Sequence, residues 1–84
     1  MLLYERLLYA ASLYPKAPAL IRHNQTMSYG DLHRLSERLG YALFAEGLRR
    51  GDRIAICGDP DPKLVLAFYA AVGIETIPLM PSPS

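Results

Sequence analysis

The stretch from Leu64 to Ile74 carries no charged residue on any side, and this constrains the fold more than any other part of the chain. It has about half the length that a membrane span needs, so we expect it inside a folded domain. Pro62 suits the first turn of a helix, where its missing N–H leaves no bond unmade, and Asp61 suits the cap before it. The sequence therefore predicts a helix over residues 62–74 that is buried nearly all round.

Two short apolar stretches flank this helix. Residues 53–57, Arg-Ile-Ala-Ile-Cys, follow a turn at 49–52 and are typical of a buried strand, and residues 76–80 form a second candidate strand. A strand, a helix and a strand in this order predict a right-handed crossover unit with parallel strands. The fold class is therefore α/β, with a sheet that looks unfinished.

The N-terminal stretch predicts an amphipathic helix over residues 2–14. Leu3, Leu7 and Tyr14 recur at helical spacing, and Pro15 ends the pattern because proline disfavours helical geometry at the residue before it. Charged residues interrupt the apolar run, so the order of basic head, apolar stretch and cleavage site that a signal peptide needs is absent.

A short β-hairpin is expected next. Candidate strands at 19–22 and 26–28 flank the polar turn His23-Asn24-Gln25, whose asparagine suits a tight reversal. The order of elements up to this point is helix and then hairpin.

A capping signal predicts the start of a second helix, over residues 29–46. Ser28 and Asp31 have capping-box spacing, so the serine hydroxyl can accept from a free amide of the first turn and Asp31 can return a bond. Gly47 suits the left-handed residue that closes a helix. The apolar face of this helix is expected to comprise Leu32, Leu35, Leu39, Ala42 and Leu43. The solvated face is expected to comprise His33, Arg34, Glu37 and Arg38.

Composition bounds the possible partners. The 84 residues suffice for one small domain, and 51% of them are apolar, which provides a core. The net charge of +1 favours neither nucleic acid nor an anionic membrane as a partner. The lone Cys57 excludes an internal disulfide framework and indicates a reducing, cytoplasmic setting.

Individual residues give little sign of catalysis. Tyr29 lies in a first helical turn, where packing is the ordinary role of a tyrosine. His23 lies in a polar turn and His33 on a solvated face, and neither has a second ligand at metal-binding spacing. Cys57, at the end of a buried strand, is expected to be a small core residue rather than a nucleophile.

The remaining candidates also have structural explanations. Asp59 and Asp61 resemble paired carboxylates, but each precedes a proline and capping explains them. Phe68 and Tyr69 lie in the uncharged helix and are expected in the core. Acidic residues are interleaved with the basic ones, so a solvated surface rather than a phosphate patch is expected for Arg34, Arg38, Arg49, Arg50 and Arg53.

Two blocks of sequence resemble the ATP-dependent adenylate-forming superfamily, which contains acyl-CoA synthetases, adenylation domains and luciferase-like enzymes. Met27-Ser28-Tyr29-Gly30-Asp31-Leu32 is similar to its first core motif, Ser/Thr-Tyr-x-Glu-Leu. The block from Gly73 to Pro81 is similar to the second, Ala-Gly-Ala-x-x-Val-Pro-Leu-x-Pro. The likeness runs from Pro15 to Pro81 and departs from the pattern at Val72, Ile74 and Met80. Met80 stands where amino-acid-activating members often carry Asp, which leans slightly toward an acyl or aryl acid.

The resemblance implies that residues 1–84 are a single partial domain, the N-terminal portion of such an enzyme, with a linker-like tail at 81–84. The family's phosphate loop ending in Pro-Lys-Gly and its other catalytic motifs are absent from this sequence. No catalytic, cofactor-binding or metal-binding residue is therefore assigned to this chain. ATP and Mg²⁺ are implied only for the complete enzyme, an acid–thiol ligase whose acceptor is coenzyme A or a carrier protein.

The partners implied are the rest of the adenylating enzyme or a complementing chain, with a homo-oligomer as a further possibility. Neither nucleic acid nor a membrane span is expected. An alternative reading is a non-catalytic binding or assembly module that self-associates or complements a second chain. A piece cut from a larger enzyme is a third.

Overall fold

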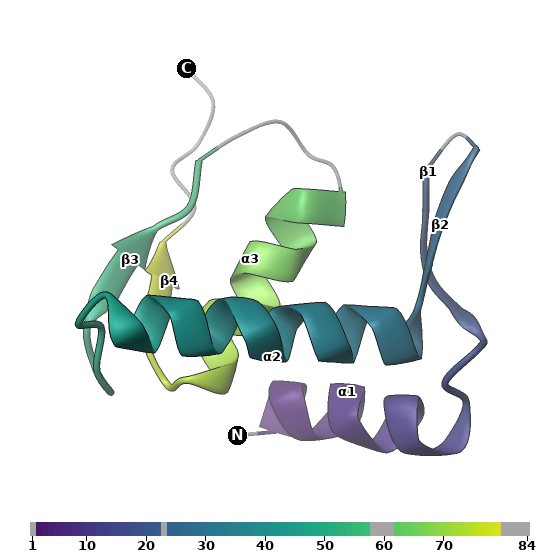
Figure 1. Ribbon diagram of the computed structural model, residues 1–84, viewed down its shortest axis with the longest axis horizontal. Coiled ribbons are helices and arrows are strands. Elements are labelled where there is room, and N and C mark those ends of the chain that lie inside the picture. Colours follow the sequence, from purple (N-terminus) through teal and green to yellow (C-terminus); the bar gives the residue numbers. More distant parts are fainter. Residues whose placement is uncertain (1, 23, 58–61, 80–84) are drawn as a thin grey trace.

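The computed structural model describes residues 2–22, 24–57 and 62–79 and has the predicted α/β class (Figure 1). Every predicted helix and strand is present, with ends that differ by a few residues. In chain order the elements are α1 (Leu2–Leu13), β1 (Pro18–Arg22), β2 (Gln25–Ser28), α2 (Tyr29–Ala45), β3 (Arg53–Ala55), α3 (Pro62–Gly73) and β4 (Ile77–Leu79).

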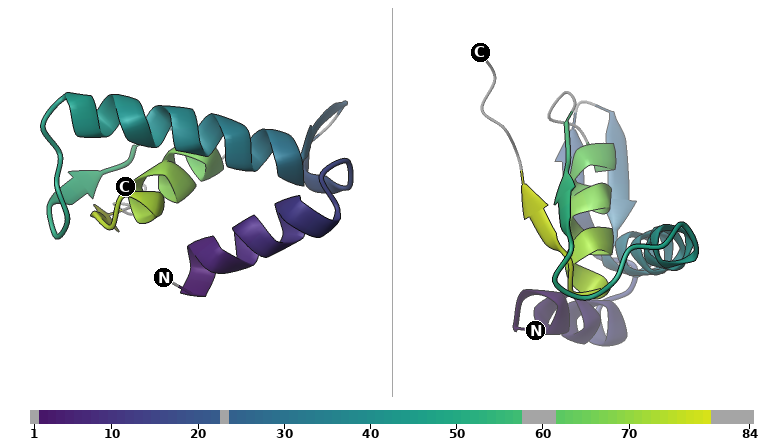
Figure 2. Two further views of the ribbon diagram at one scale, coloured as in Figure 1. Left: turned by 60° about the horizontal axis from the view of Figure 1, so that its bottom comes forward. Right: turned by 90° about the vertical axis from the view of Figure 1, so that its left-hand side faces the viewer.

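The long helix α2 organises the fold (Figures 1 and 2). Helices α1 and α3 both pack against it, and α1 also contacts α3. The antiparallel pair β1–β2 stands at the N-terminal end of α2, and the parallel pair β3–β4 lies near its C-terminal end. The two small sheets are therefore separated by the length of one helix.

The turn after α1 is locked to the start of α2. The amide of Gly30 donates to the carbonyl of Pro15 at 2.9 Å, and the amide of Tyr29 donates to that of Ala17 at 3.0 Å. A Cβ atom on residue 30 would lie 2.9 Å from the Pro15 carbonyl oxygen, closer than real contacts allow. Glycine at position 30 thus permits this close backbone approach.

Helix α2 begins at its predicted cap. Ser28 is extended, with φ −76° and ψ 163°, and its hydroxyl accepts from the Asp31 amide at 3.1 Å. The expected return bond from Asp31 is not found among the described residues, because its carboxylate contacts Arg34 at 3.4 Å. At the other end Gly47 has a φ of 109°, which confirms the predicted left-handed closing residue.

Replacing Ser28 by alanine should lower the free energy of unfolding by about 0.5–2 kcal/mol, because the Asp31 amide loses its acceptor. Asp31→Ala should cost less, about 0.3–1 kcal/mol, since it removes only a favourable charge at the helix start. Asp31→Ala keeps the amide that Ser28 caps, so the double variant should be additive within about 0.5 kcal/mol. Denaturant midpoints of the three variants measure this. An unchanged midpoint for Ser28→Ala would show that the cap contributes nothing.

Small residues occupy the closest contact between α2 and α3. The residues of α2 that are buried are Leu32, Ser36 and Gly40, rather than the broad leucine face expected from the sequence. A Cβ atom on residue 40 would lie 3.2 Å from Ile74 Cγ2 and 3.4 Å from the Ala70 carbonyl oxygen. The larger Leu35 and Leu39, one turn apart on the same side of this contact, are only half-buried.

The buried core comes from all three helices and from Ile56, which directly follows β3. Its apolar members are Leu7, Leu32, Ile56, Ala70, Ala71 and Val72. Only the last turns of α3 are buried, and residues 64–69 are half-buried. The prediction of a helix surrounded on all sides is therefore wrong for this chain, because α1 and α2 cover only part of it.

The strands β3 and β4 pair in parallel, with Arg53 opposite Ile77 and Ala55 opposite Leu79. Further hydrogen bonds extend the pair, from the Ile77 amide to the Asp52 carbonyl at 2.7 Å and from Ile56 to Leu79 at 2.8 Å. The expectation of a buried strand over 53–57 holds for Ile56 alone. Both ends of β3 are exposed, because among the described strands its only neighbour is β4.

Candidate functional site

The surroundings of Tyr29 and His33 in the structure can be compared with those expected from the sequence. Tyr29 is half-buried and lines a cleft of about 290 Å³ with Leu7 and Tyr69. His33 does not lie on a solvated face. Its side chain is 27% exposed, beneath the ring of Tyr4, with 6.2 Å between ring centroids. His23 lies outside the described residues.

The five arginines lie on the surface, as expected. Arg34 contacts the Asp31 carboxylate, and Arg50 forms an ion pair of 2.9 Å with Glu75. Arg49 lies 3.7 Å from the centroid of the Phe44 ring and donates to the Phe44 carbonyl at 2.7 Å. Three of these arginines therefore already have partners within the chain: a carboxylate for Arg34 and Arg50, and an aromatic ring and a helix end for Arg49.

Cys57, Phe68 and Tyr69 are less buried than the sequence predicts. Cys57 is exposed rather than buried, because the strand ends before it and nothing in the described part of the chain covers it. Phe68 and Tyr69 meet edge to face at 5.8 Å but are only half-buried, since the outer side of α3 is uncovered. Asp59, Asp61 and the tail at 81–84 lie outside the described residues.

Both motif blocks serve to build the scaffold. The first forms the cap of α2 and the lock to Pro15 described above. In the second, the hydroxyl and amide of buried Thr76 both donate to the Ala71 carbonyl, at 2.8 and 3.1 Å. Glu75 adopts a φ of 62°, uncommon for a residue with a side chain, and its carbonyl accepts from the Gly51 amide at 2.9 Å. These bonds fix the tight connection that leads the chain from the end of α3 into β4.

The residues of this chain do not fit ATP with Mg²⁺. The sequence has no glycine-rich phosphate loop with a following lysine, and the described residues hold no group of three His, Cys, Asp or Glu side chains that could share a metal ion. Across 2–22, 24–57 and 62–79, no helix combines the length and apolarity needed to cross a bilayer.

Apolar side chains remain exposed on several parts of the surface, including Ile21 of β1 and Tyr41 and Phe44 of α2. On β4, Ile77 is 46% exposed and Leu79 is 47% exposed. On the outer side of α1 and just after it, the exposed apolar residues are Leu8, Tyr9, Leu13 and Tyr14. A small monomeric domain rarely leaves apolar side chains of this size grouped on its surface.

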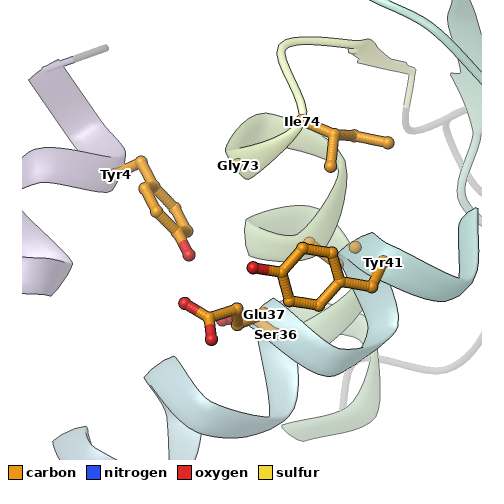
Figure 3. Close-up of a pocket in the computed structure, with 8 residues that line it drawn as sticks. Tyr4, Ser36, Glu37, Tyr41, Gly73 and Ile74 are labelled. Atoms are coloured by element: carbon orange, nitrogen blue, oxygen red, sulfur yellow. The ribbon is translucent and has the colours of Figure 1, made fainter. Parts of the chain in front are cut away.

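A second cleft, of about 220 Å³, lies where the start of α1 meets the middle of α2 and the end of α3 (Figure 3). Its lining residues are Tyr4, Ser36, Glu37, Gly40, Tyr41, Ala70, Gly73 and Ile74. The ring of Tyr4 lies against Gly73, where a Cβ atom would come within 2.9 Å of the ring. The floor is closed by Ser36, whose hydroxyl donates to the Leu32 carbonyl at 2.7 Å.

The electrostatics of this cleft are dominated by oxygen atoms. Burial raises the pKa of Tyr4 above its usual value, and the negative charge of Glu37 and the neighbouring Tyr41 raise the pKa further. The hydroxyl of Tyr4 therefore remains protonated at neutral pH. Nε2 of His33 is buried, has no hydrogen-bond partner in the described part of the chain, and lies 3.6 Å from Glu37 Oε2.

Sequence reasoning did not find this cleft, because Tyr4 and Glu37 come from different helices. One signal was available: Glu37 and Tyr41 are four residues apart and share a helix face. The contact with Tyr4 depends on the close approach of Gly73, which no periodicity reveals.

Comparison with known proteins places the chain among the relatives of one enzyme family. The model of the family described as AMP-binding enzyme matches residues 7–84. Nonribosomal peptide synthetase 8 of Aspergillus fumigatus is 37% identical over 70 residues, which covers 81% of this chain and 1% of that protein. The fatty acid–[acyl-carrier-protein] ligase ScoC of Streptomyces coeruleorubidus is 46% identical over 44 residues, 52% of this chain and 8% of the ligase.

Solved structures give the same fold. O-succinylbenzoate coenzyme A synthetase of Bacillus subtilis, in complex with AMP, superimposes with a TM-score of 0.85 at 29% identity. The match covers 90% of this chain and 20% of the synthetase, which has also been solved with ATP and a magnesium ion. The chain thus spans only a small part of the relatives that it matches.

Proposed function

The chain belongs to the AMP-binding enzyme family, and we propose that it serves as an N-terminal scaffold portion of an ATP-dependent ligase that converts a carboxylate into an acyl-adenylate. The observation that carries the proposal is the match over residues 7–84, which includes both motif blocks. Relatives named as ligases and coenzyme A synthetases support the reaction class.

The reaction of the complete enzyme has two steps. ATP and a carboxylate give an acyl-adenylate and release pyrophosphate, and a thiol of coenzyme A or of a carrier protein then takes the acyl group. Such catalysis depends on positioning and on stabilising charge. ATP and Mg²⁺ belong to the parts of the enzyme that carry the phosphate loop, and this chain contributes no reacting group.

The contribution of this chain is to hold its helices and strands in place for the remainder of the domain. Parallel sheets normally have both faces covered and further strands beside them. Here β3 and β4 have three residues each, and Ile77 and Leu79 of β4 are about half exposed. The residues that follow in the complete ligase would extend this sheet and cover α3. We place this enzyme in the cytoplasm, in keeping with the lone Cys57.

A second candidate function is a non-catalytic assembly module. It is favoured by the exposed apolar residues of α1, Tyr9 at 68% and Leu13 at 51%, which belong to a different element from the exposed residues of β4. Such a module would pair with a copy of itself or with a chain that supplies the missing part of the enzyme.

The coding sequence downstream of Ser84 distinguishes the two functions. For the scaffold portion we expect a continuing reading frame that encodes a Ser/Thr/Gly-rich loop ahead of Pro-Lys-Gly, which the ligase needs for its phosphates. A native stop codon directly after Ser84 would contradict that and favour the assembly module.

A further inference from the structure

Three oxygen-bearing side chains face one small space in the cleft between the three helices (Figure 3). The hydroxyl groups of Tyr4 and Tyr41 and the carboxylate of Glu37 point toward one another from α1 and α2. From this geometry we propose that the cleft binds a primary ammonium group. None of the residues that line this cleft belongs to β3 or β4, and the proposal does not rest on the function proposed above.

The number and charge of the oxygens match an ammonium. A primary ammonium has three N–H donors and one positive charge, and the cleft offers three oxygen-bearing groups to meet them, two phenol hydroxyls and one carboxylate. None of the residues lining it is cationic. The cleft also lies at the C-terminal end of α3, where a helix carries partial negative charge and favours cations.

The wall beside the oxygens suits a short carbon chain. Ala70 and Ile74 line the cleft on the α3 side, and Gly40 and Gly73 leave room there because they have no side chains. An alkyl stem on the ammonium would lie along this wall while its nitrogen reaches Glu37. The ring of Tyr4, held against Gly73, fixes one side of the nitrogen position.

Other ligand classes fit less well. Anions would meet the Glu37 carboxylate with no cation beside it to offset the charge. A quaternary ammonium has no N–H to donate. The competitor present in the chain is His33, whose Nε2 lies 3.6 Å from the same carboxylate.

The ammonium could come from a free amine or from a lysine side chain of a neighbouring protein segment, since both have a primary nitrogen on a carbon chain. The test is therefore a titration of the ¹⁵N-labelled chain with n-butylammonium and, separately, with a blocked lysine amide. At pH 8, where histidine is generally uncharged, we expect saturable amide shifts around the cleft, with a dissociation constant on the order of 1–10 mM. Tighter binding of the blocked lysine would indicate a protein segment, and tighter binding of butylammonium a free amine.

Matched variants test the assignment. Glu37→Gln should weaken butylammonium binding at least tenfold, and Tyr4→Phe or Tyr41→Phe should weaken it about threefold. Glu46→Gln and Tyr14→Phe, which change exposed residues outside the cleft, should leave it unchanged. Thermal melts of each variant establish that the fold is kept, and Glu37 is exposed enough for its substitution to be tolerated.

Ligand analogues separate hydrogen bonding from simple charge attraction. Butan-1-ol should not bind detectably, and butyltrimethylammonium should bind at least fivefold more weakly than butylammonium, because it has no N–H. Equal or tighter binding of the trimethylated ligand, equal losses in Glu37→Gln and Glu46→Gln, or the absence of saturable shifts would each overturn the proposal.

Discussion

Sedimentation of the isolated chain is expected to show concentration-dependent association rather than a single well-folded monomer. Ile77 and Leu79 are each nearly half exposed on a two-stranded parallel sheet, and α3 is fully buried only over residues 70–72. Fully burying one such side chain contributes about 1.5–3 kcal/mol, so even part of that gain at several positions favours association. Among the described strands, the outer edges of β3 and β4 have unpaired backbone groups, with which a strand of another copy can form hydrogen bonds.

Leu79→Lys provides a sharp test of where the association occurs. A charge at this half-exposed position should weaken association at least tenfold, which corresponds to about 1.4 kcal/mol. Thr26→Lys, which adds a charge at an exposed polar position of the hairpin, is the control and should have little effect. A monomer at all concentrations, with strongly protected amides in 53–57 and 64–74, would show that the chain closes its own core.

Pyrophosphate exchange by the pure 84-residue chain should stay at background with every carboxylate tried. The chain has no phosphate loop and no catalytic lysine, and the loss of even one charge-stabilising donor commonly slows an enzyme by about 10²–10³. Calorimetry should likewise detect no tight binding of ATP with Mg²⁺. The ligase encoded by a continuing reading frame, assayed in parallel, should exchange pyrophosphate when its carboxylate is present.

Substrate-dependent exchange from the pure chain would contradict this prediction. A trace of contaminating ligase is controlled for by a Gly30→Val variant purified in the same way. Its added side chain would collide with the Pro15 carbonyl and disrupt the fold. Exchange that persists unchanged in this variant would therefore come from a contaminant.

Local signals in the sequence predicted the ends of α2 well. Ser28 and Gly47 act through backbone bonds within a few residues, so their residue types determine the structure almost regardless of the surroundings. The burial of the same helix was predicted less well. Apolar periodicity selects large residues, whereas the closest contact with α3 is made at Ser36 and Gly40, where the small size allows the helices to approach.

Contacts between distant segments account for the other differences. His33 has the spacing of a solvated residue, but α1 packs against α2 and places the ring of Tyr4 beside it. Cys57 has the neighbours of a buried strand residue, yet it is exposed because no described strand lies beside it. The cleft lined by Tyr4, Glu37 and Tyr41 also depends on the packing of α1 against α2. Only Glu37 and Tyr41, which share a face of α2, could be placed together from the sequence.

The lock between the Pro15 turn and the start of α2 also bears on the order in which the chain folds during synthesis. The bonds from Tyr29 and Gly30 back to Ala17 and Pro15 close short stretches of chain, which is entropically cheap and fast. Pairing of Arg53 with Ile77 must wait until all of α3 has left the ribosome. The first helix, the hairpin and the cap of α2 can therefore form a native-like nucleus on the nascent chain, while the half-covered α3 and its strands remain available to whatever is synthesised next.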